Sequence, residues 1–578
     1  MMTLGKVLYV DLTERKFEVV ERFDLFDKYL GGSGVGSKLL LDECPQGVDP
    51  FAPENPVILS VGPLNCLYPC ASKTVANFKS PITGSYGESH AGGRLSFALR
   101  MAGYGALVIK GFSERLVCLF VDDEGVTFRG AEPLKGLSSL EVERELRRLE
   151  GPGVESIVSI GPAGERMVFY ASVNVDRYNY FGRLGLGAIF GAKNLKAIVI
   201  RGSGEVKAVN PDAHRKLFDK VYDEVLKTDK MSKYHYVGTP VNVLTLNAIK
   251  ALPTRNFQQG WFEYAEEISG ELIGEKYLER KVSCAGCPLG CLHVAKLKPA
   301  FAPGYEYEPI DIYYNYESIY ALGSNLGIKS APEVLRLIYK ANMIGVDTML
   351  VGNALGWLTE AYEKGLISDK ETLGLKPRWG DTETYLKVLD NLLKTPNEFY
   401  ALMAQGVNPM AEAYGGFDYA TTIAGNGLAG YFTGYASIVG TAVAARHSHN
   451  SNAGYSIDQK ALRKPLTPSQ IVDELIKEED WRFVQTSMVI CLFSRGVYTP
   501  SLTVEALKTV GIERSEEELY RLGSEIFMNA YRFKFREGFS FETLKIPNRF
   551  FEVPTSNGVL SREVVNQMIM EYRRKRWG

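Results

Sequence analysis

This sequence lacks a surplus of charge of either sign. Lys and Arg together number 66 and Asp and Glu 68 in 578 residues, which leaves a formal net charge of -2 at pH 7. Nucleic-acid-binding proteins usually have a surplus of basic residues, and polyacidic proteins have a surplus of acidic ones. The balanced charge of this chain indicates neither class. Small-molecule chemistry is favoured instead, with no nucleic-acid partner.

Cysteine is also scarce, with eight residues in the whole chain, and three of them fall in one short run. So few cysteines in so long a chain do not form a disulfide framework. The first residues run directly into strand-like sequence without the pattern of a signal peptide. We therefore expect a protein of the reducing cytoplasm.

Long hydrophobic runs are missing as well. The longest uncharged stretch, 419–445, could cross a bilayer by length alone. Its repeated glycines and threonines, together with Asn426, make it only weakly apolar, so we expect no membrane span and a buried segment that lines an interior cavity. Glycine is abundant by contrast, at 57 residues, and an excess over the usual ~7% indicates tight turns and close backbone approaches to something bound.

The order of residue patterns predicts an α+β protein. Alternating apolar and polar residues over 6–20 are typical of a hairpin, and further strand-like segments continue to residue 201. Long amphipathic stretches follow, which predict helices. We expect an N-terminal β-rich domain and then two mainly helical domains, with boundaries at 1–208, 209–415 and 416–578.

Some individual elements can be predicted. The glycine-rich segment 29–38 is typical of a loop that approaches a phosphate or cofactor before a helix, although it matches no complete nucleotide-binding motif. Helices are expected at 214–227, 331–349 and 355–364.

The most informative stretch is a C-x2-C-x3-C run formed by Cys284, Cys287 and Cys291, with His293 close behind. Short loops between thiols let several thiolates reach one centre, which favours an iron–sulfur cluster. A Cys3His zinc site that uses His293 and a set of plain buried cysteines are the alternatives. A cubane needs a fourth ligand, and Cys491 is the one cysteine further along the chain.

Together with segments 79–84, 182–196 and 316–325, this run resembles the aldehyde:ferredoxin oxidoreductase family over nearly the whole chain. The resemblance implies a tungsten (or molybdenum) ion held by two pyranopterin dithiolenes, a magnesium ion bridging the pterins and one 4Fe-4S cluster. It also implies a pterin-binding β domain followed by two helical domains.

Residue by residue, the resemblance makes Cys284, Cys287, Cys291 and Cys491 the cluster ligands and implies no protein ligand to tungsten. The pterin-contacting positions fall on Lys73, His90, Gly92, Gly93, Arg183, Leu184 and Gly185, and on two further elements that contain Asn342 and Asp347, and Thr486 and Ile490. Asn342 and Thr486 stand where the family has aspartate, and Lys73 and His90 replace arginine and asparagine. For Arg183 a structural salt bridge is the alternative interpretation.

For catalysis the resemblance implies a glutamate and a histidine over the metal. Glu317 matches the glutamate, with a carboxylate at a helix N-terminus as the alternative. His447 and His449 both lie near the expected position of the histidine. Because a single residue separates them, they are unlikely to face one pocket together. We favour His449.

The implied reaction is the oxidation of an aldehyde with water to a carboxylic acid, with electrons passing through the cluster to a ferredoxin or a small iron–sulfur subunit. Arg280, Lys281, Lys296 and Lys298 flank the cysteine run and favour an acidic partner, unless they are ordinary solvated charges. A homo- or hetero-oligomer is compatible with the family. The alternatives are the catalytic subunit of a tungsten-dependent acyl-CoA reductase of the benzoyl-CoA type and a non-catalytic electron-transfer subunit.

Overall fold

In the part of the chain that the computed structural model describes (residues 4–151, 156–229, 231–300, 304 and 306–578), the N-terminal strands form two six-stranded sheets. The first has the order β2-β1-β6-β3-β4-β5, with β1 (Lys6–Asp11), β2 (Lys16–Glu21), β3 (Val57–Ser60), β4 (Thr74–Lys79), β5 (Tyr86–Ala91) and β6 (Ala106–Lys110). The second has the order β11-β10-β9-β12-β7-β8, with β7 (Val117–Asp122), β8 (Gly125–Gly130), β9 (Ser156–Ile160), β10 (Val173–Val175), β11 (Asn179–Phe181) and β12 (Leu195–Ile200). The hairpin predicted at 6–20 is the antiparallel pair β1 and β2.

Six helices accompany these sheets in the described chain: α1 (Phe23–Tyr29), α2 (Gly32–Glu43), α3 (Leu95–Met101), α4 (Ser139–Glu150), α5 (Pro162–Glu165) and α6 (Leu186–Ala192). The prediction of a cofactor loop at 29–38 is wrong, because α2 already begins at Gly32. Its glycines are needed for packing: a Cβ on Gly32 would strike the Thr486 carbonyl, and one on Gly36 would strike the Asn77 side chain. The segment therefore lets α2 lie against β4 and the C-terminal helices.

The middle of the chain is mainly helical. Its helices are α7 (Pro211–Lys227), α8 (Asn242–Ala248), α9 (Gly270–Lys276), α10 (Tyr316–Leu322), α11 (Ala331–Ile344), α12 (Thr348–Glu363), α13 (Asp369–Thr372), α14 (Thr382–Lys394), α15 (Glu398–Gln405) and α16 (Val407–Tyr414). The single helix predicted at 331–349 is wrong. Gly345, with φ +84°, ends α11, and the Asp347 side chain accepts a hydrogen bond from Met349 N to cap α12.

A three-stranded sheet lies within this helical part, with β13 (Leu278–Val282), β14 (Leu292–Leu297) and β15 (Ile310–Tyr314) in that order. The cysteine run is the loop between β13 and β14, so a hairpin rather than a pair of helices carries it.

The last part contains α17 (Tyr435–Val443), α18 (Gly454–Ala461), α19 (Pro468–Ser487), α20 (Pro500–Thr509), α21 (Glu516–Arg536), α22 (Arg549–Glu552) and α23 (Arg562–Trp577), and a short ladder of β16 (Thr422–Ile423) and β17 (Asn426–Gly427). Capping boxes at Thr467 and Ser515 start the two long helices α19 and α21. Among the described residues, no helix combines the length and apolarity needed to cross a membrane. The predicted α+β class is confirmed, and the domain boundaries stay predictions.

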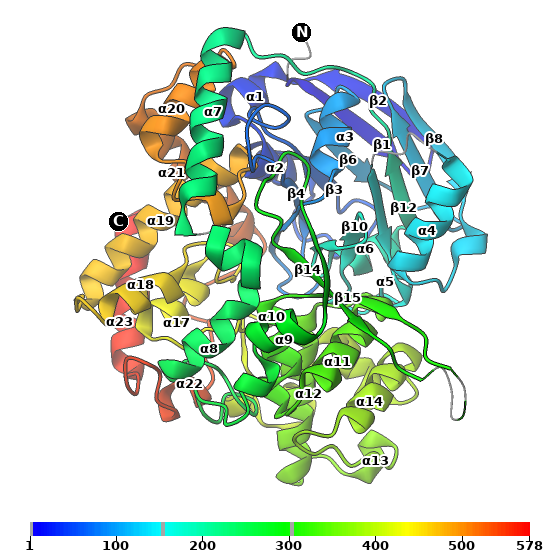
Figure 1. Ribbon diagram of the computed structural model, residues 1–578, viewed down its shortest axis with the longest axis vertical. Coiled ribbons are helices and arrows are strands. Elements are labelled where there is room, and N and C mark those ends of the chain that lie inside the picture. Colours follow the sequence, from blue (N-terminus) through cyan, green and yellow to red (C-terminus); the bar gives the residue numbers. More distant parts are fainter. Residues whose placement is uncertain (1–3, 152–155, 230, 301–303, 305) are drawn as a thin grey trace.

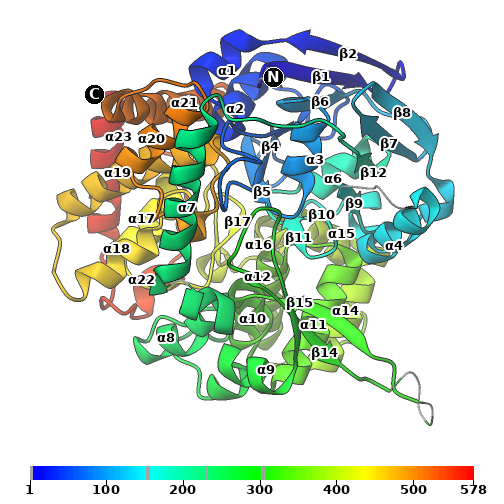
Figure 2. The same ribbon diagram turned by 45° about the horizontal axis from the view of Figure 1, so that its top comes forward.

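The three parts of the chain meet around the centre of the molecule. Figure 1 shows the blue and cyan strands above the green helices of the middle part, with the orange and red helices beside both. The turned view of Figure 2 keeps β14, β15 and α10 below β5 and β11. Residues from all three parts can therefore contribute to a site at this junction.

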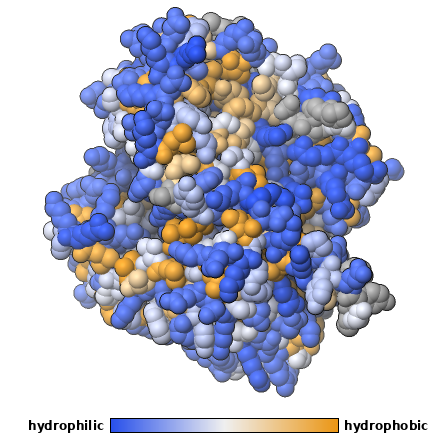
Figure 3. Space-filling model, viewed as in Figure 1, coloured by the Kyte–Doolittle hydropathy of each residue, from blue (hydrophilic) through white to orange (hydrophobic). Residues whose placement is uncertain are grey.

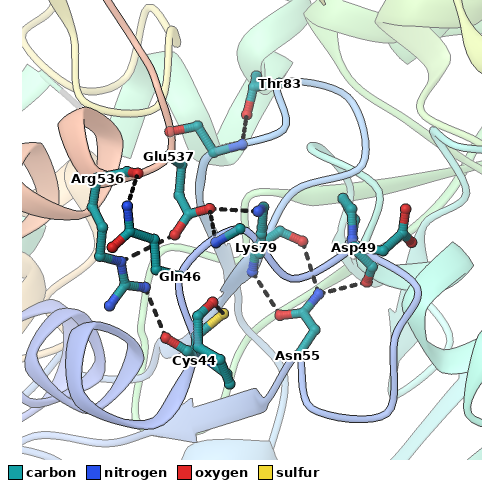
Figure 4. A network of polar contacts seen from close by, with 12 residues as sticks. Cys44, Gln46, Asp49, Asn55, Lys79, Thr83, Arg536 and Glu537 are labelled. Atoms are coloured by element: carbon teal, nitrogen blue, oxygen red, sulfur yellow. Dashed lines mark hydrogen bonds and ion pairs between the residues drawn. The ribbon is translucent and has the colours of Figure 1, made fainter.

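A buried ion pair ties the first sheet to the C-terminal helices. Lys79, at the end of β4, lies 2.5 Å from Glu537, just beyond α21, and the two side chains are 6% and 1% exposed. The Lys79 backbone exchanges two hydrogen bonds with the Asn55 amide, and Arg536 donates to the Cys44 carbonyl (Figure 4). Arg536 also donates to the Leu41 carbonyl. Both charges are paired and hydrogen-bonded, which is what burial of an ion pair requires.

Candidate active site

A cavity of about 1750 Å³, a volume that includes the solvent at its open mouth, lies where the three parts of the chain meet. Most of the predicted site residues line it: Lys73, His90, Gly92, Arg183, Leu184, Cys284, Cys287, Cys291, Glu317, Asn342, Asp347, His449, Ile490 and Cys491. They come from β5 and the segments beside it, the segment after β11, the β13–β14 loop, α10 and α11, and the segments that follow α11, α17 and α19. The fold thus gathers residues that lie up to several hundred positions apart in the sequence.

The sulfur end of the cavity is built by backbone turns. Gly286 and Gly290 adopt φ values of +64° and +54°, which a residue with a side chain rarely adopts, so the loop can fold tightly around its thiols. Cys491 is held beside this loop because its N–H donates to the Cys70 carbonyl at 2.9 Å, while the Cys70 N–H donates to the Gly286 carbonyl at 3.0 Å. A further backbone hydrogen bond joins the same two segments, from the Lys73 N–H to the Val489 carbonyl.

Cys70 is a fifth thiol at this end that the sequence prediction missed. Its Sγ lies 3.6 Å from Cys287 Sγ, and the side chain is buried. The sequence carries a signal, since Cys66 and Cys70 form a C-x3-C pair, but this pair lies more than 200 residues before the main run. Only the fold brings the two together.

These thiols suit a cluster better than a single ion. No group of three or more His, Cys, Asp or Glu side chains among the described residues is close enough to hold one metal ion, whereas a cubane spreads its ligands over a wider space. His293, the candidate zinc ligand, is hydrogen-bonded through Nε2 to the His235 carbonyl at 3.1 Å, and its Nδ1, without a partner among the described residues, lies against Gly238 and not on the cavity that the cysteines line. The structure therefore gives no support to the Cys3His alternative.

Lys73 lines the cavity close to the sulfurs. Burial opposes its charge, but the thiols of Cys491, Cys284 and Cys291 raise its pKa above the usual value, so the ammonium is retained. Gly92 borders the same space without a side chain. A Cβ added there would strike Cys284 Sγ and come within 3.1 Å of Lys73 Nζ. The cavity here is shaped for a group that needs a cation and bare backbone.

The predicted pterin residues Arg183 and Asp347 contact each other. Arg183 Nε lies 3.3 Å from an Asp347 carboxylate oxygen, and Nη2 donates to Asn426 Oδ1 at 2.7 Å and to the Gly427 carbonyl. Burial raises the pKa of Asp347, and Arg183 and the helix cap oppose that rise. The salt bridge considered as the alternative for Arg183 is thus present, and both side chains still face the cavity.

A second polar group surrounds Glu88, which the sequence analysis did not single out. Glu88 accepts from Tyr86 OH at 2.7 Å and lies 2.8 Å from His90 Nε2. Arg446 Nη1 donates to the Glu88 carbonyl at 3.2 Å. Arg446, just before the two candidate histidines, is therefore paired in the cavity wall.

Two buried polar atoms of the lining have no hydrogen-bond partner among the described residues, Ser72 Oγ and His449 Nδ1. Buried polar groups are almost always paired, so unpaired atoms on a cavity wall point to a polar ligand. Together with the bare backbone at Gly92, they show that the residues present fit a large polar cofactor.

Glu317 and His449 form the polar end of the site. Glu317 begins α10, whose N-cap is Asn315, and its Oε1 lies 3.9 Å from His449 Nε2 and accepts from Tyr431 OH at 3.1 Å. Burial raises the pKa of Glu317, and the Tyr431 hydrogen bond opposes that rise. Burial, then the charges of Arg183 and Arg446, lower the pKa of His449 well below its usual value, so this imidazole is neutral.

Four predicted residues do not line the cavity: Gly93, Gly185, His447 and Thr486. His447 turns away, with Nδ1 against the Thr441 carbonyl at 3.2 Å and Nε2 against Lys534 Nζ at 3.0 Å. The Thr486 hydroxyl donates to the Arg482 carbonyl one turn earlier in α19. Gly185 (φ +86°) instead makes room for the Phe169 carbonyl, which a Cβ would strike.

The outer surface over the cysteine loop is apolar. A hollow there is lined by Cys66, Leu67, Tyr68, Phe97, Phe218, Tyr222, Cys284, Gly286, Cys287 and Pro288. Figure 3 shows pale and orange side chains gathered on this face between α7 and α3. The basic residues predicted to surround the run are partly neutralised, because Arg280 pairs with Asp311 at 2.7 Å and Lys296 pairs with Glu279.

Comparison with known families gives two adjoining matches. Residues 7–202 match the sequence model described as "Aldehyde ferredoxin oxidoreductase, N-terminal domain", and residues 216–577 match "Aldehyde ferredoxin oxidoreductase, domains 2 & 3". The two matches span nearly the whole chain and meet near the first predicted domain boundary.

Individual relatives agree with this assignment. The chain is 31% identical over 571 residues to a tungsten-containing aldehyde ferredoxin oxidoreductase of Pyrococcus furiosus, covering 96% of this chain and 92% of the relative. It is 32% identical to the protein of the same name from Pyrococcus horikoshii, covering 99% and 96%. The WOR-like subunit of an aliphatic sulfonate oxidoreductase from Pyrococcus furiosus is 29% identical over 70% of this chain and 66% of its own length.

One solved structure has the same fold. The active site complex BamBC of benzoyl coenzyme A reductase, with 1,5-dienoyl-CoA, superimposes with a TM-score of 0.84, covering 100% of this chain and 94% of the other. At 22% sequence identity this likeness shows the fold alone.

Proposed function

The chain belongs to the aldehyde ferredoxin oxidoreductase family, and on that premise we propose that this oxidoreductase oxidises an aldehyde to a carboxylic acid at a tungsten pterin centre. The family membership expected from the sequence is confirmed. The cofactors, the substrate and the electron path of this chain go beyond that membership and are part of the proposal.

The residues present fit the cofactors. Cys284, Cys287, Cys291 and Cys491 would hold a 4Fe-4S cluster, and Lys73, with Gly92 beside it, would offer the pterin an ammonium group and bare backbone. Arg183, Asp347 and His90 would hydrogen-bond the pterins, and a magnesium ion would complete the cofactor. When bound, the tungsten pterin supplies a two-electron acceptor and the cluster a one-electron carrier.

The chain's own contribution is proton handling and orientation. Oxidation of an aldehyde with one water yields a carboxylic acid, two protons and two electrons. Glu317 takes a proton from the attacking water, and the pKa that burial raises makes its carboxylate a stronger base for this step. The neutral His449 imidazole has one N–H to donate to the substrate oxygen, which polarises the carbonyl without adding charge.

The observation that carries the proposal is the Glu317–His449 pair on a cavity wall shared with the cysteines. A non-catalytic electron-transfer subunit would not need a buried carboxylate with a raised pKa beside an unpaired imidazole nitrogen. The shared fold with a benzoyl coenzyme A reductase complex keeps acyl-CoA reduction as the second candidate.

Electrons would leave through the apolar hollow to a ferredoxin or a small iron–sulfur subunit. The hollow includes Cys284 and Cys287, whereas two of the four basic residues near the run already have acidic partners. Tyr222→Glu, at the rim of the hollow, should slow ferredoxin reduction and leave the rate with a small viologen unchanged. If ferredoxin reduction falls steeply with salt and Tyr222→Glu has no effect, the basic patch is the docking site instead.

The function is tested by metal analysis and turnover of protein purified without chelators. We expect about one tungsten and about four iron atoms per chain and aldehyde-dependent reduction of a viologen. Iron without tungsten would identify an electron-transfer subunit. A metal-replete protein that oxidises no aldehyde but reduces an aromatic acyl-CoA with a strong reductant would identify the reductase.

A further inference from the structure

A thiol that the proposed cluster does not need lies against one of its ligands. Cys70 Sγ is 3.6 Å from Cys287 Sγ, and the Cys70 side chain is 0% exposed. A cysteine that ligates iron does so as a thiolate, which has no proton to donate. Once Cys287 is a ligand, therefore, only Cys70 of this pair can donate a hydrogen bond, and the Cys287 sulfur is its acceptor.

Backbone contacts hold Cys70 at this place. Its N–H donates to the Gly286 carbonyl at 3.0 Å and its carbonyl accepts from the Cys491 N–H at 2.9 Å, so it joins two segments that carry proposed ligands. Its φ of +63° lies in the left-handed region, which residues with a side chain rarely adopt. Strained residues gather at functional positions, and this one places a thiol against a ligand.

Cys70 is suited to donate rather than to ligate. A cubane takes four thiolates, and Cys284, Cys287, Cys291 and Cys491 already supply them. A second thiolate 3.6 Å from the Cys287 sulfur would add a like charge in a buried place, which is costly. Burial in the core favours the neutral thiol over the thiolate, so Cys70 keeps the hydrogen that it donates.

Hydrogen bonds to the sulfurs of a cluster raise its reduction potential, because they stabilise the negative charge that grows when the cluster takes up an electron. We propose that Cys70 donates its S–H to Cys287 and so raises the reduction potential of the 4Fe-4S cluster. Cys70 acts through its neighbour and is a positioning residue, not a catalytic one. A higher potential favours electron flow from the substrate toward the cluster, the direction that aldehyde oxidation needs. This inference rests on the cluster of the proposed function and adds a residue that adjusts it.

The test is a redox titration followed by the electron paramagnetic resonance signal of the reduced cluster, which measures the potential without turnover. Cys70→Ala removes the donor, and the equilibrium constant for cluster reduction should fall by about 3- to 10-fold, as for one modest hydrogen bond. This corresponds to a shift of about 30 to 60 mV to lower potential, since a factor of ten is about 59 mV for one electron. Cys70→Ser keeps a hydroxyl donor and should restore part of the shift.

Cys70→Gly is a second variant without a donor. Glycine suits the left-handed backbone at this position, so this variant reports the same shift if the alanine variant is unstable. The matched control is Cys118→Ala. Cys118, on β7, is also a buried thiol, 2% exposed, but it does not line the cavity, so its loss should leave the potential at the native value. Iron content is measured in every variant, and all should keep about four iron atoms per chain.

Three results would overturn the proposal. A native potential in Cys70→Ala would mean that the two sulfurs merely pack against each other. A higher potential would mean that Cys70 acts by keeping water from the cluster, because water that donates to the sulfurs raises the potential. Loss of iron from both Cys70→Ala and Cys70→Gly would make Cys70 a ligand or a support of the loop instead of a donor.

Potential and activity together separate this inference from the function. If the protein oxidises no aldehyde but Cys70→Ala has the lower potential, the donor stands and the proposed function fails. If aldehydes are oxidised and the potential of Cys70→Ala is native, the function stands and the donor fails. A native protein without a 4Fe-4S signal would end both.

Discussion

The sulfur end and the polar end of the cavity are built by different means. At the sulfur end the chain is shaped by backbone turns, with left-handed Gly286 and Gly290 and hydrogen bonds between the segments at Cys70 and Cys491. At the polar end, side chains position each other, as Tyr431 does for Glu317. The first arrangement fixes where ligands lie, and the second sets protonation states through burial and neighbouring charge.

Substitutions should therefore have different signatures at the two ends. Loss of a side chain at the sulfur end should remove a cofactor, whereas loss of one at the polar end should change rates and pH profiles in a cofactor-replete protein. A variant that mixes the two signatures would show that the ends are coupled.

The largest effect is expected for Cys291→Ser, which should abolish the electron paramagnetic resonance signal of a reduced 4Fe-4S cluster. The matched control is Cys70→Ala, because Cys70 is a buried thiol at the same end, 3.6 Å from Cys287, but lies outside the predicted ligand set. It should keep about four iron atoms per chain. The ligand assignment is wrong if the two variants behave in the opposite way.

Next in size is Glu317→Gln, which keeps the shape and hydrogen bonding of the side chain but cannot accept a proton. We expect kcat to fall by about 10²-fold or more with normal tungsten and iron content. Because a base must be deprotonated and burial raises the pKa of Glu317, native kcat should rise with pH through a range above the usual carboxyl value. Activity of Glu317→Gln close to native would remove this residue from the mechanism.

The two ends also differ in how far the sequence predicts them. The spacing of Cys284, Cys287 and Cys291 is local, so it indicates a ligand loop before any fold is known. Together with segments 79–84, 182–196 and 316–325 it also indicated the family. Cys70 was missed because its pairing with Cys287 spans 217 residues. The glycines of 32–36 were misread as a cofactor loop because their contacts, Asn77 and Thr486, are distant in the sequence.

Orientation at the polar end was the hardest property to predict. His447 and His449 are only two positions apart, and the residue that holds His447 away from the cavity, Lys534, lies 87 positions further on. A local motif contains no information of this kind.

A smaller effect separates the two histidines. His449→Asn should lower kcat by about 10- to 100-fold, because the variant loses the imidazole that faces Glu317 at 3.9 Å. His447→Asn should change kcat little and reduce thermal stability, because His447 contacts Thr441 and Lys534 outside the cavity. Kinetics and melting curves of both variants decide the assignment, which is reversed if the loss of kcat falls on His447.

The smallest effect is expected for Tyr431→Phe, which removes the hydroxyl that donates to Glu317 Oε1 and keeps the ring stacked on Tyr455. That hydrogen bond stabilises the carboxylate and so holds the pKa of Glu317 down against burial. Without it the pKa rises further, the base is protonated over a wider range, and the acid limb of the kcat profile moves to higher pH. At the acid end kcat should fall by about 3- to 10-fold and at high pH it should approach the native value. Tyr320→Phe is the control, since its hydroxyl donates to the Leu428 carbonyl and not to Glu317. An equal loss at every pH in Tyr431→Phe would mean that the tyrosine acts through packing, and protonation at the polar end would then be set by burial alone.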